Sequence, residues 1–204
     1  MQRSIMFAAA AIAALSLAAC SREEAANNPN NPGQSEPVNA AQDAVGAAVG
    51  QTSAATLGAN TKQGYVMNAA VGDMYEIAAG NMAQQRSKNA DVKAFAKMIV
   101  TDHTAASNQM KPLAQAAGET PPAEMDQRRK GMIDNLKAAS DADFDKVFLT
   151  QQVAAHEEAL TLHQGYAGNG DEAGLKGHAA KVAPKIQAHL DKAKQLAQGA
   201  GAAH

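Results

Sequence analysis

Apolar residues recur at intervals of three and four along most of the chain after Asn60, which is the spacing of an amphipathic helix. Four long segments carry this pattern, at about residues 61–87, 89–117, 141–168 and 171–198. A shorter amphipathic segment, about residues 123–138, lies between the second and third of them. The pattern predicts an all-α domain over residues 61–199, a four-helix bundle with a short extra helix in the connection, and a disordered tail over residues 200–204.

Capping and turn residues mark where these helices begin and end. Asn89 is a suitable N-cap for the second helix, and Gly118 follows its end. Gly168-Asn169-Gly170 separates the last two helices closely enough to make them an antiparallel hairpin. The connection over residues 118–140 is long enough to run the length of the bundle, which would give a ferritin-like arrangement, or to lie across one end of an up-down bundle.

The N-terminal residues read as a targeting segment. Residues 1–20 combine a positively charged start, an apolar run and small residues before Cys20, as a signal peptide does. Leu17-Ala18-Ala19-Cys20 resembles the bacterial lipobox, whose cysteine carries the lipid, and Ser21 suggests by resemblance the outer membrane. We therefore expect a lipid anchor at Cys20 that holds the chain on the periplasmic face of that membrane. An ordinary signal peptide that leaves a free thiol is the alternative.

Residues 21–60 are rich in Asn, Ala, Gly and Pro and carry few bulky apolar residues. Such a segment buries too little apolar area to offset its ordering entropy. We predict a flexible tether, in which a short helix near residues 39–49 would be marginal in isolation.

Composition and charge exclude several classes of protein. Lys and Arg number 18 against 20 Asp and Glu, and no basic cluster occurs, so no nucleic-acid partner is expected. The single cysteine excludes a disulfide framework. The chain also lacks a Gly-x-Ser-x-Gly motif and a phosphate-binding glycine loop, so enzymatic activity is not the expected function. Nothing in the sequence names a protein partner.

Histidines replace apolar residues on the core-facing sides of three predicted helices. In the second helix His103 lies on a stripe that alternates steps of four and three, and His189 holds the same kind of position in the last helix. His156 lies on one of two competing stripes of the third helix. Counted from the predicted helix starts, all three lie near mid-length, so we expect them to meet in one layer.

The first helix offers one candidate at the same height, Glu76. Glu76 faces the core if the stripe of Tyr65 and Ala69 does, and faces water if the rival stripe of Met67 and Met74 does. Small residues beside Glu76 would permit close helix approach, which favours the inward orientation.

Three imidazoles and a carboxylate, at His103, His156, His189 and Glu76, could bind zinc, copper, iron or manganese. The alternative is a buried network in which neutral histidines hydrogen-bond to one another and to Glu76. The pattern alone weighs toward the network, because an inward histidine is more often structural than a ligand, although three in one layer are rarer. The functions that follow are metal storage, buffering or sensing, a non-metal envelope interaction or stress-related module, and a pH-responsive bundle.

Other polar residues receive simpler interpretations. Asp102 is expected to be solvated or to support a ligand rather than to bind metal itself. His163 and His178 are expected at a partly exposed boundary, and Glu157 and Glu158 on a solvated face.

Five segments of the chain together resemble a bacterial family called domain of unknown function 4142, of the ferritin-like group. They are residues 92–103, 144–145, 152–157, 183–184 and 189–190. The resemblance covers about residues 64–196, and the Glu, Asp-His and later His positions of the family match Glu76, Asp102 with His103, His156 and His189. It implies an envelope protein or lipoprotein and no established reaction.

The comparison with ferritins also disfavours di-iron chemistry. Di-iron bundles use Glu-x-x-His pairs, whose carboxylates bridge the two irons. Here Val100, Val153 and Ile186 stand three residues before the three histidines. Ferroxidase or oxygen-activating chemistry is therefore not expected.

Overall fold

The computed structural model describes residues 36–201, and over this range the chain is all-α. The prediction of a helical bundle is therefore confirmed. Within these residues no helix combines the length and hydropathy needed to span a membrane. The elements are α2 (Glu36–Ser53), the π-helix η1 (Ala54–Gly58), α3 (Lys62–Arg86), α4 (Ala90–Ala116), α5 (Gln127–Ala138), α6 (Phe144–Asn169) and α7 (Ala173–Gly201).

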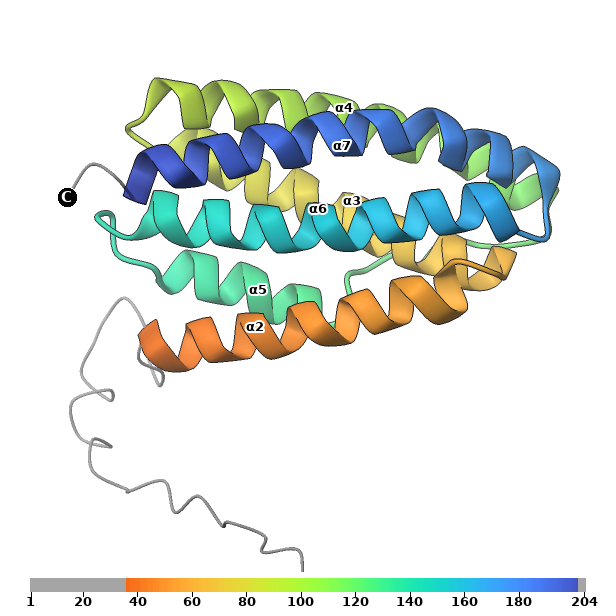
Figure 1. Cartoon of the computed structure of the whole chain (residues 1–204), viewed down its shortest axis with the longest axis horizontal. Helices are drawn as coiled ribbons and strands as arrows, with labels where there is room; N and C mark the ends of the chain where they lie inside the picture. Colours follow the sequence, from red (N-terminus) through yellow and green to blue (C-terminus); the bar gives the residue numbers. More distant parts are fainter. Residues whose placement is uncertain (1–35, 202–204) are drawn as a thin grey trace, which may run out of the picture.

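Two helical hairpins, α3 with α4 and α6 with α7, make up the bundle (Figure 1). The hairpins pack against each other through α4 on α7 and α3 on α6. In Figure 1, α4 and α6 run in the same direction, opposite to α3 and α7. The connection between α4 and α6 therefore returns along the bundle, and α5 forms its second half.

Side chains cap α4 and α5, at Asn89 as the sequence indicated and at Asp126. The Asn89 side chain accepts from the backbone N–H groups of Asp91 and Val92, which confirms Asn89 as the N-cap of α4. Asp126 caps α5 by accepting from the Arg129 N–H at 2.7 Å. After α4 the chain turns at Gly118, whose φ of 79° is a conformation that favours glycine.

Helix α2 corrects the prediction of a flexible tether over residues 21–60. Residues 36–58 are helical and pack against α5 and α6. Asp43 accepts from Gln151 Nε2 at 2.6 Å and from Asn135 Nδ2 at 2.9 Å, and the carbonyl of Gly46 accepts from Arg128. These polar partners, together with the fully buried Ala54, hold the segment in place.

Three predictions fall wholly or partly outside the described residues. The predicted signal peptide, Cys20 and residues 21–35 of the predicted tether lie there, as do residues 202–204 of the predicted tail. The rest of that tail is helical, because α7 continues to Gly201.

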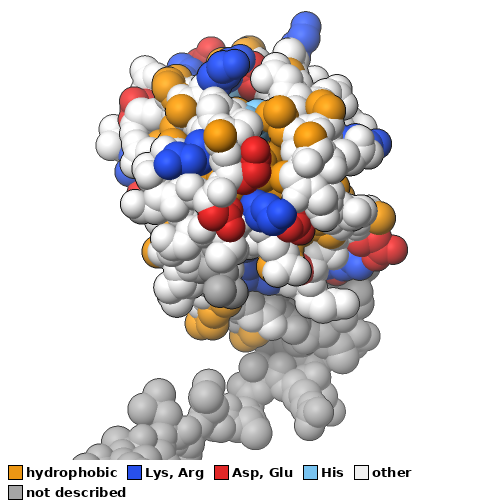
Figure 2. Space-filling view, turned by 90° about the vertical axis from the view of Figure 1, so that its right-hand side faces the viewer, with side chains coloured by type: hydrophobic (Ala, Val, Ile, Leu, Met, Phe, Trp, Pro, Cys, Tyr) orange, Lys and Arg blue, Asp and Glu red, His pale blue; other side chains and the backbone are white. Residues whose placement is uncertain are grey.

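Apolar side chains form two main clusters, one in each half of the bundle. The first contains Tyr75, Phe95, Phe144 and Phe148, and the second contains Tyr65, Met110, Leu162 and Tyr166. In sequence position the three inward histidines fall between these clusters on α4, α6 and α7, so the polar layer is enclosed by apolar packing on both sides. Figure 2 shows the end of the bundle where α6 turns into α7, with acidic and basic side chains intermixed on that face.

Candidate metal centre

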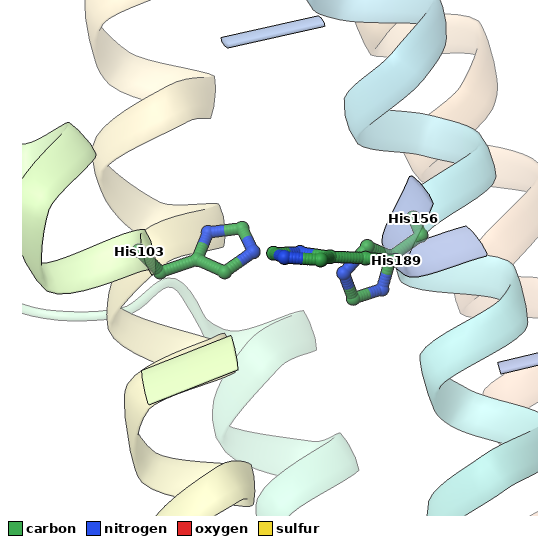
Figure 3. A group of neighbouring side chains, drawn as sticks. All are labelled: His103, His156 and His189. Carbon is green, nitrogen blue, oxygen red and sulfur yellow. The ribbon is translucent and has the colours of Figure 1, made fainter. Parts of the chain in front are cut away.

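His103, His156 and His189 converge at mid-bundle from α4, α6 and α7 (Figure 3). Their ring centroids are 5.4–5.6 Å apart, and one nitrogen from each ring lies within 4.8 Å of the other two. All three side chains are buried, with 0–3% of each residue exposed. The layer expected from helix periodicity therefore exists, and we call these three residues the histidine trio.

The outer nitrogen of each ring has a hydrogen-bond acceptor. Asp73 Oδ1 accepts from His103 Nδ1 at 2.8 Å, the carbonyl of Gln152 accepts from His156 Nδ1 at 2.9 Å, and Asp102 Oδ2 accepts from His189 Nε2 at 3.0 Å. Such acceptors fix the tautomer, because the proton must lie on the outer nitrogen. The inner nitrogen of each neutral ring then presents a lone pair.

The inner nitrogens have no partner in the described structure. His103 Nε2, His156 Nε2 and His189 Nδ1 are all buried without a hydrogen bond. A buried polar atom without a hydrogen bond costs about 1–3 kcal/mol. The network alternative requires the rings to hydrogen-bond to one another, and they do not. Their inner nitrogens are left available to bind a metal ion.

Burial and charge set the protonation of the trio. Burial lowers the pKa of His156 to about 3, and the neighbouring His103 lowers it further. Burial, with His156 and His103 nearby, lowers the pKa of His189 to about 4. Burial also acts to lower the pKa of His103, but Asp73, together with Glu76 and Asp102, outweighs it and raises that pKa. Two of the three rings are therefore neutral at neutral pH, as metal ligation requires.

Glu76 points inward, as the small residues beside it suggested, and is 3% exposed. Its Oε1 lies 3.7 Å from His156 Nδ1, the outer nitrogen, and its Oε2 has no partner. Burial raises its pKa, against the opposing effect of His103. The close group of nitrogens contains only the three histidines, so Glu76 lies beside the predicted site rather than within it.

Asp102 occupies the supporting position expected for it. One of its oxygens accepts from His189, and the other accepts from Lys185 Nζ at 2.6 Å. Its side chain is 26% exposed, so it joins the buried trio to the surface between α4 and α7.

Sequence reasoning missed Asp73, which supports His103 in the same way. Asp73 is 5% exposed, and its second oxygen accepts from Ser107 Oγ at 2.7 Å. The available signal was its position on α3, three residues before Glu76 and therefore on the same helix face.

Three other residues correct expectations of exposure. His163 and His178 are each 4% exposed rather than at an open boundary, and Tyr65 OH lies 3.0 Å from His163 Nδ1. Glu158 is 4% exposed, because Arg128 and Arg129 both pair with it, at 2.7 and 2.9 Å. Glu157 does lie at the surface, paired with Lys194.

Comparison with known proteins identifies relatives of this fold. The family described as "Domain of unknown function (DUF4142)" matches residues 47–196. A solved structure described as "CopM in the Cu(II)-bound form" is 23% identical with a TM-score of 0.59, and the match covers 68% of this chain and 97% of that one.

A second structure, "CopM in the Ag-bound form (by co-crystallization)", is 22% identical with a TM-score of 0.57, covering 68% of this chain and 96% of that one. At these identities the likeness shows the fold. A search of curated proteins gave no match.

Proposed function

This chain belongs to the DUF4142 family, and we propose that it binds one copper ion between His103, His156 and His189. The observation that carries the proposal is the set of three buried, unpartnered inner nitrogens whose outer nitrogens are each held by an acceptor. Metal-ligating histidines are held in this way in proteins, because a hydrogen bond to the outer nitrogen fixes the tautomer and orients the ring.

Two lines of support favour copper among the transition metals. Imidazole suits zinc, copper, iron and nickel alike, but Cu(II) binds nitrogen sites most tightly of the divalent first-row ions. Structures with this fold are described as Cu(II)-bound and Ag-bound. Three imidazole nitrogens form a donor set that suits copper.

We place the protein on the periplasmic face of the outer membrane, anchored through a lipid on Cys20. The support is the lipobox-like Leu17-Ala18-Ala19-Cys20 after an apolar run. At that location the bundle would store, buffer or sense copper in the periplasm.

Metal analysis tests the binding proposal. The protein is purified without chelator, dialysed against Cu(II) or Zn(II), and its metal content measured by mass spectrometry. We expect about one copper per chain in the wild type and none at this site in the His103→Ala, His189→Ala double variant, because only one ligand then remains. His178→Ala is the matched control, since it removes a buried histidine outside the trio and should retain the ion.

The same experiment decides between the metal site and a metal-free module. Copper content that is equal in the wild type and the double variant would contradict the proposal. It would assign the histidines to a structural role and direct the search for function to protein partners.

A further inference from the structure

A small cavity lies beside the trio and reaches toward the surface between α3 and α6. Its volume is about 20 Å³, and its lining includes Gly72, Asp73, Glu76, His103, Ala155 and Ala159. A volume of this size holds about one water-sized particle. The cavity is therefore wide enough for a single metal ion that has lost most of its water shell.

The outer edge of the cavity is open at Gly72. A Cβ added to Gly72 would meet no heavy atom within 4 Å. On the side of α3 that packs against α4 the contact is close, since a Cβ at Gly80 would lie 2.7 Å from Val100 Cγ2. The small side chains of Ala155 and Ala159 face this edge from α6. The edge of α3 that lines this cavity is therefore open at Gly72.

The inner wall of the cavity carries the buried acidic side chains of Asp73 and Glu76, and the buried guanidinium of Arg129. Asp73 and Glu76 are 5% and 3% exposed, and Glu76 Oε2 has no hydrogen-bond partner. Glu158, the third acid in the lining, is already paired with Arg128 and Arg129. An unpartnered carboxylate oxygen favours a cation, and an oxygen donor can replace water in the shell of an ion before the imidazoles do.

On two other sides of the trio, existing contacts would have to give way to an ion. On the α4–α7 side, Asp102 holds both His189 and Lys185 across the gap. Phe95 packs near His156, with ring centroids 6.3 Å apart. An ion on either side would have to displace these contacts first.

We propose that metal ions enter and leave the trio through the α3–α6 seam at Gly72, with Glu76 as the transient ligand on the way. This inference rests on the proposed function, because it assigns the route by which that site is filled. In this route Glu76 affects the rate at which the ion binds and is not a ligand of the bound ion.

Stopped-flow measurement of Cu(II) binding and release tests the route. The wild-type protein is compared with Gly72→Ala and Gly72→Leu, which fill the open edge to increasing degrees. Gly177→Leu is the matched control: Gly177 is an exposed helical glycine of α7 with open space at its Cβ, and it does not line this cavity. Thermal melting of each variant confirms that it is folded.

We expect the association and dissociation rates to fall in the order Gly, Ala, Leu, by about tenfold or more for Leu, with an equilibrium constant within about twofold of the wild type. The control should keep wild-type rates. Unchanged rates in a folded Gly72→Leu variant that binds copper would overturn the route and leave the proposed function intact. A wild-type protein that binds no copper would overturn both.

Discussion

At the scale of single residues, the outer hydrogen bonds decide how well the trio can hold an ion. Asp73 on α3 and Asp102 on α4 each fix one ring in the orientation that turns its free nitrogen inward. Asp73 is the more deeply buried of the two, so water cannot easily replace it.

We predict that Asp73→Asn lowers copper affinity by about 10- to 100-fold, because the amide holds His103 less firmly than the carboxylate and removes a nearby negative charge. A competition titration against a copper chelator measures the change. Asp134→Asn is the control, since Asp134 is exposed and pairs only with Lys137 in the described structure. Equal affinities for wild type and Asp73→Asn would show that Asp73 does not support the site.

His163 gives a second residue-level prediction, on acid stability. Burial lowers the pKa of His163 from 6.5 to about 3, although the nearby Asp73 acts to raise it. His163 does not belong to the trio. Below about pH 6.5 His163 becomes protonated in the unfolded chain. In the folded protein it stays neutral down to about pH 3. The free energy of unfolding should therefore fall as pH falls through this window, by about 1.4 kcal/mol per pH unit for this one group.

Urea denaturation between pH 7 and pH 4 checks this in the metal-free protein. The free energy of unfolding of His163→Gln should fall less steeply with falling pH, because one fewer proton is taken up on unfolding. This holds whatever the stability of the variant at pH 7. Parallel pH profiles for the two proteins would rule out His163 as a source of the acid sensitivity.

Helix periodicity could predict the residues of the trio, but not their supports. His103 and His189 interrupt apolar stripes, so their inward positions follow from spacing alone. The bond from Asp73 to His103 joins two helices, and no pattern within one helix reports such a contact. The prediction that Glu158 is solvated was wrong for the same reason. Its burial depends on Arg128 and Arg129 of α5, and the position of α5 is set by the long connection between α4 and α6.

At the scale of elements, α2 is held on the bundle by close approach at Gly50. A Cβ at this position would meet the Glu158 carboxylate, which Arg128 and Arg129 keep in place. On the same helix, a Cβ at Gly46 would come no closer than 3.4 Å to Arg128 Cγ. Gly50 therefore lies at the tight contact and Gly46 at an ordinary one.

We predict that Gly50→Ala loosens α2 and that Gly46→Ala does not. Relief of the overlap should cost about 1–3 kcal/mol of docking free energy, as overpacking does elsewhere. Hydrogen exchange should then show faster exchange of the α2 amides, with little change in α3, α4, α6 and α7. Equal protection of α2 in both variants would contradict the close contact.

The sequence indicated only a marginal helix near residues 39–49 and could not predict that α2 docks, because the residues that hold it lie in α5 and α6. The segment has few bulky apolar residues, and Val38, Val45 and Val49 are all exposed in the structure. Its attachment depends on Asp43 and the Gly46 carbonyl, which bind residues about a hundred positions later. The four long helices, in contrast, carry their own periodicity and caps, so their bounds were predicted closely.

At the scale of the whole molecule, a metal ion would join three helices that belong to both hairpins. His103 is on α4, whereas His156 and His189 are on α6 and α7. At this height Asp102 of α4 already joins the hairpins by accepting from His189 and Lys185 of α7, and an ion in the trio would add a second cross-link between them.

We predict that Cu(II) at a hundredfold excess over its dissociation constant raises the melting temperature by about 5–10 °C. The reason is that a ligand bound only by the folded state adds about 2.7 kcal/mol at that excess, and a chain of this size gains about 2–4 °C per kcal/mol. Differential scanning calorimetry measures the shift. The His103→Ala, His189→Ala variant should show none, and a shift of equal size in that variant would place the copper elsewhere.

The connection that returns along the bundle between α4 and α6 affects the order in which the chain folds and binds its metal ion. Because the connection travels back along the bundle, the ring of α4 and the rings of α6 and α7 become neighbours only after both hairpins have formed and docked. A newly made, still extended chain offers isolated imidazoles and no chelating pocket. Loading must therefore follow assembly, so the compartment in which the protein folds selects the ion that it carries.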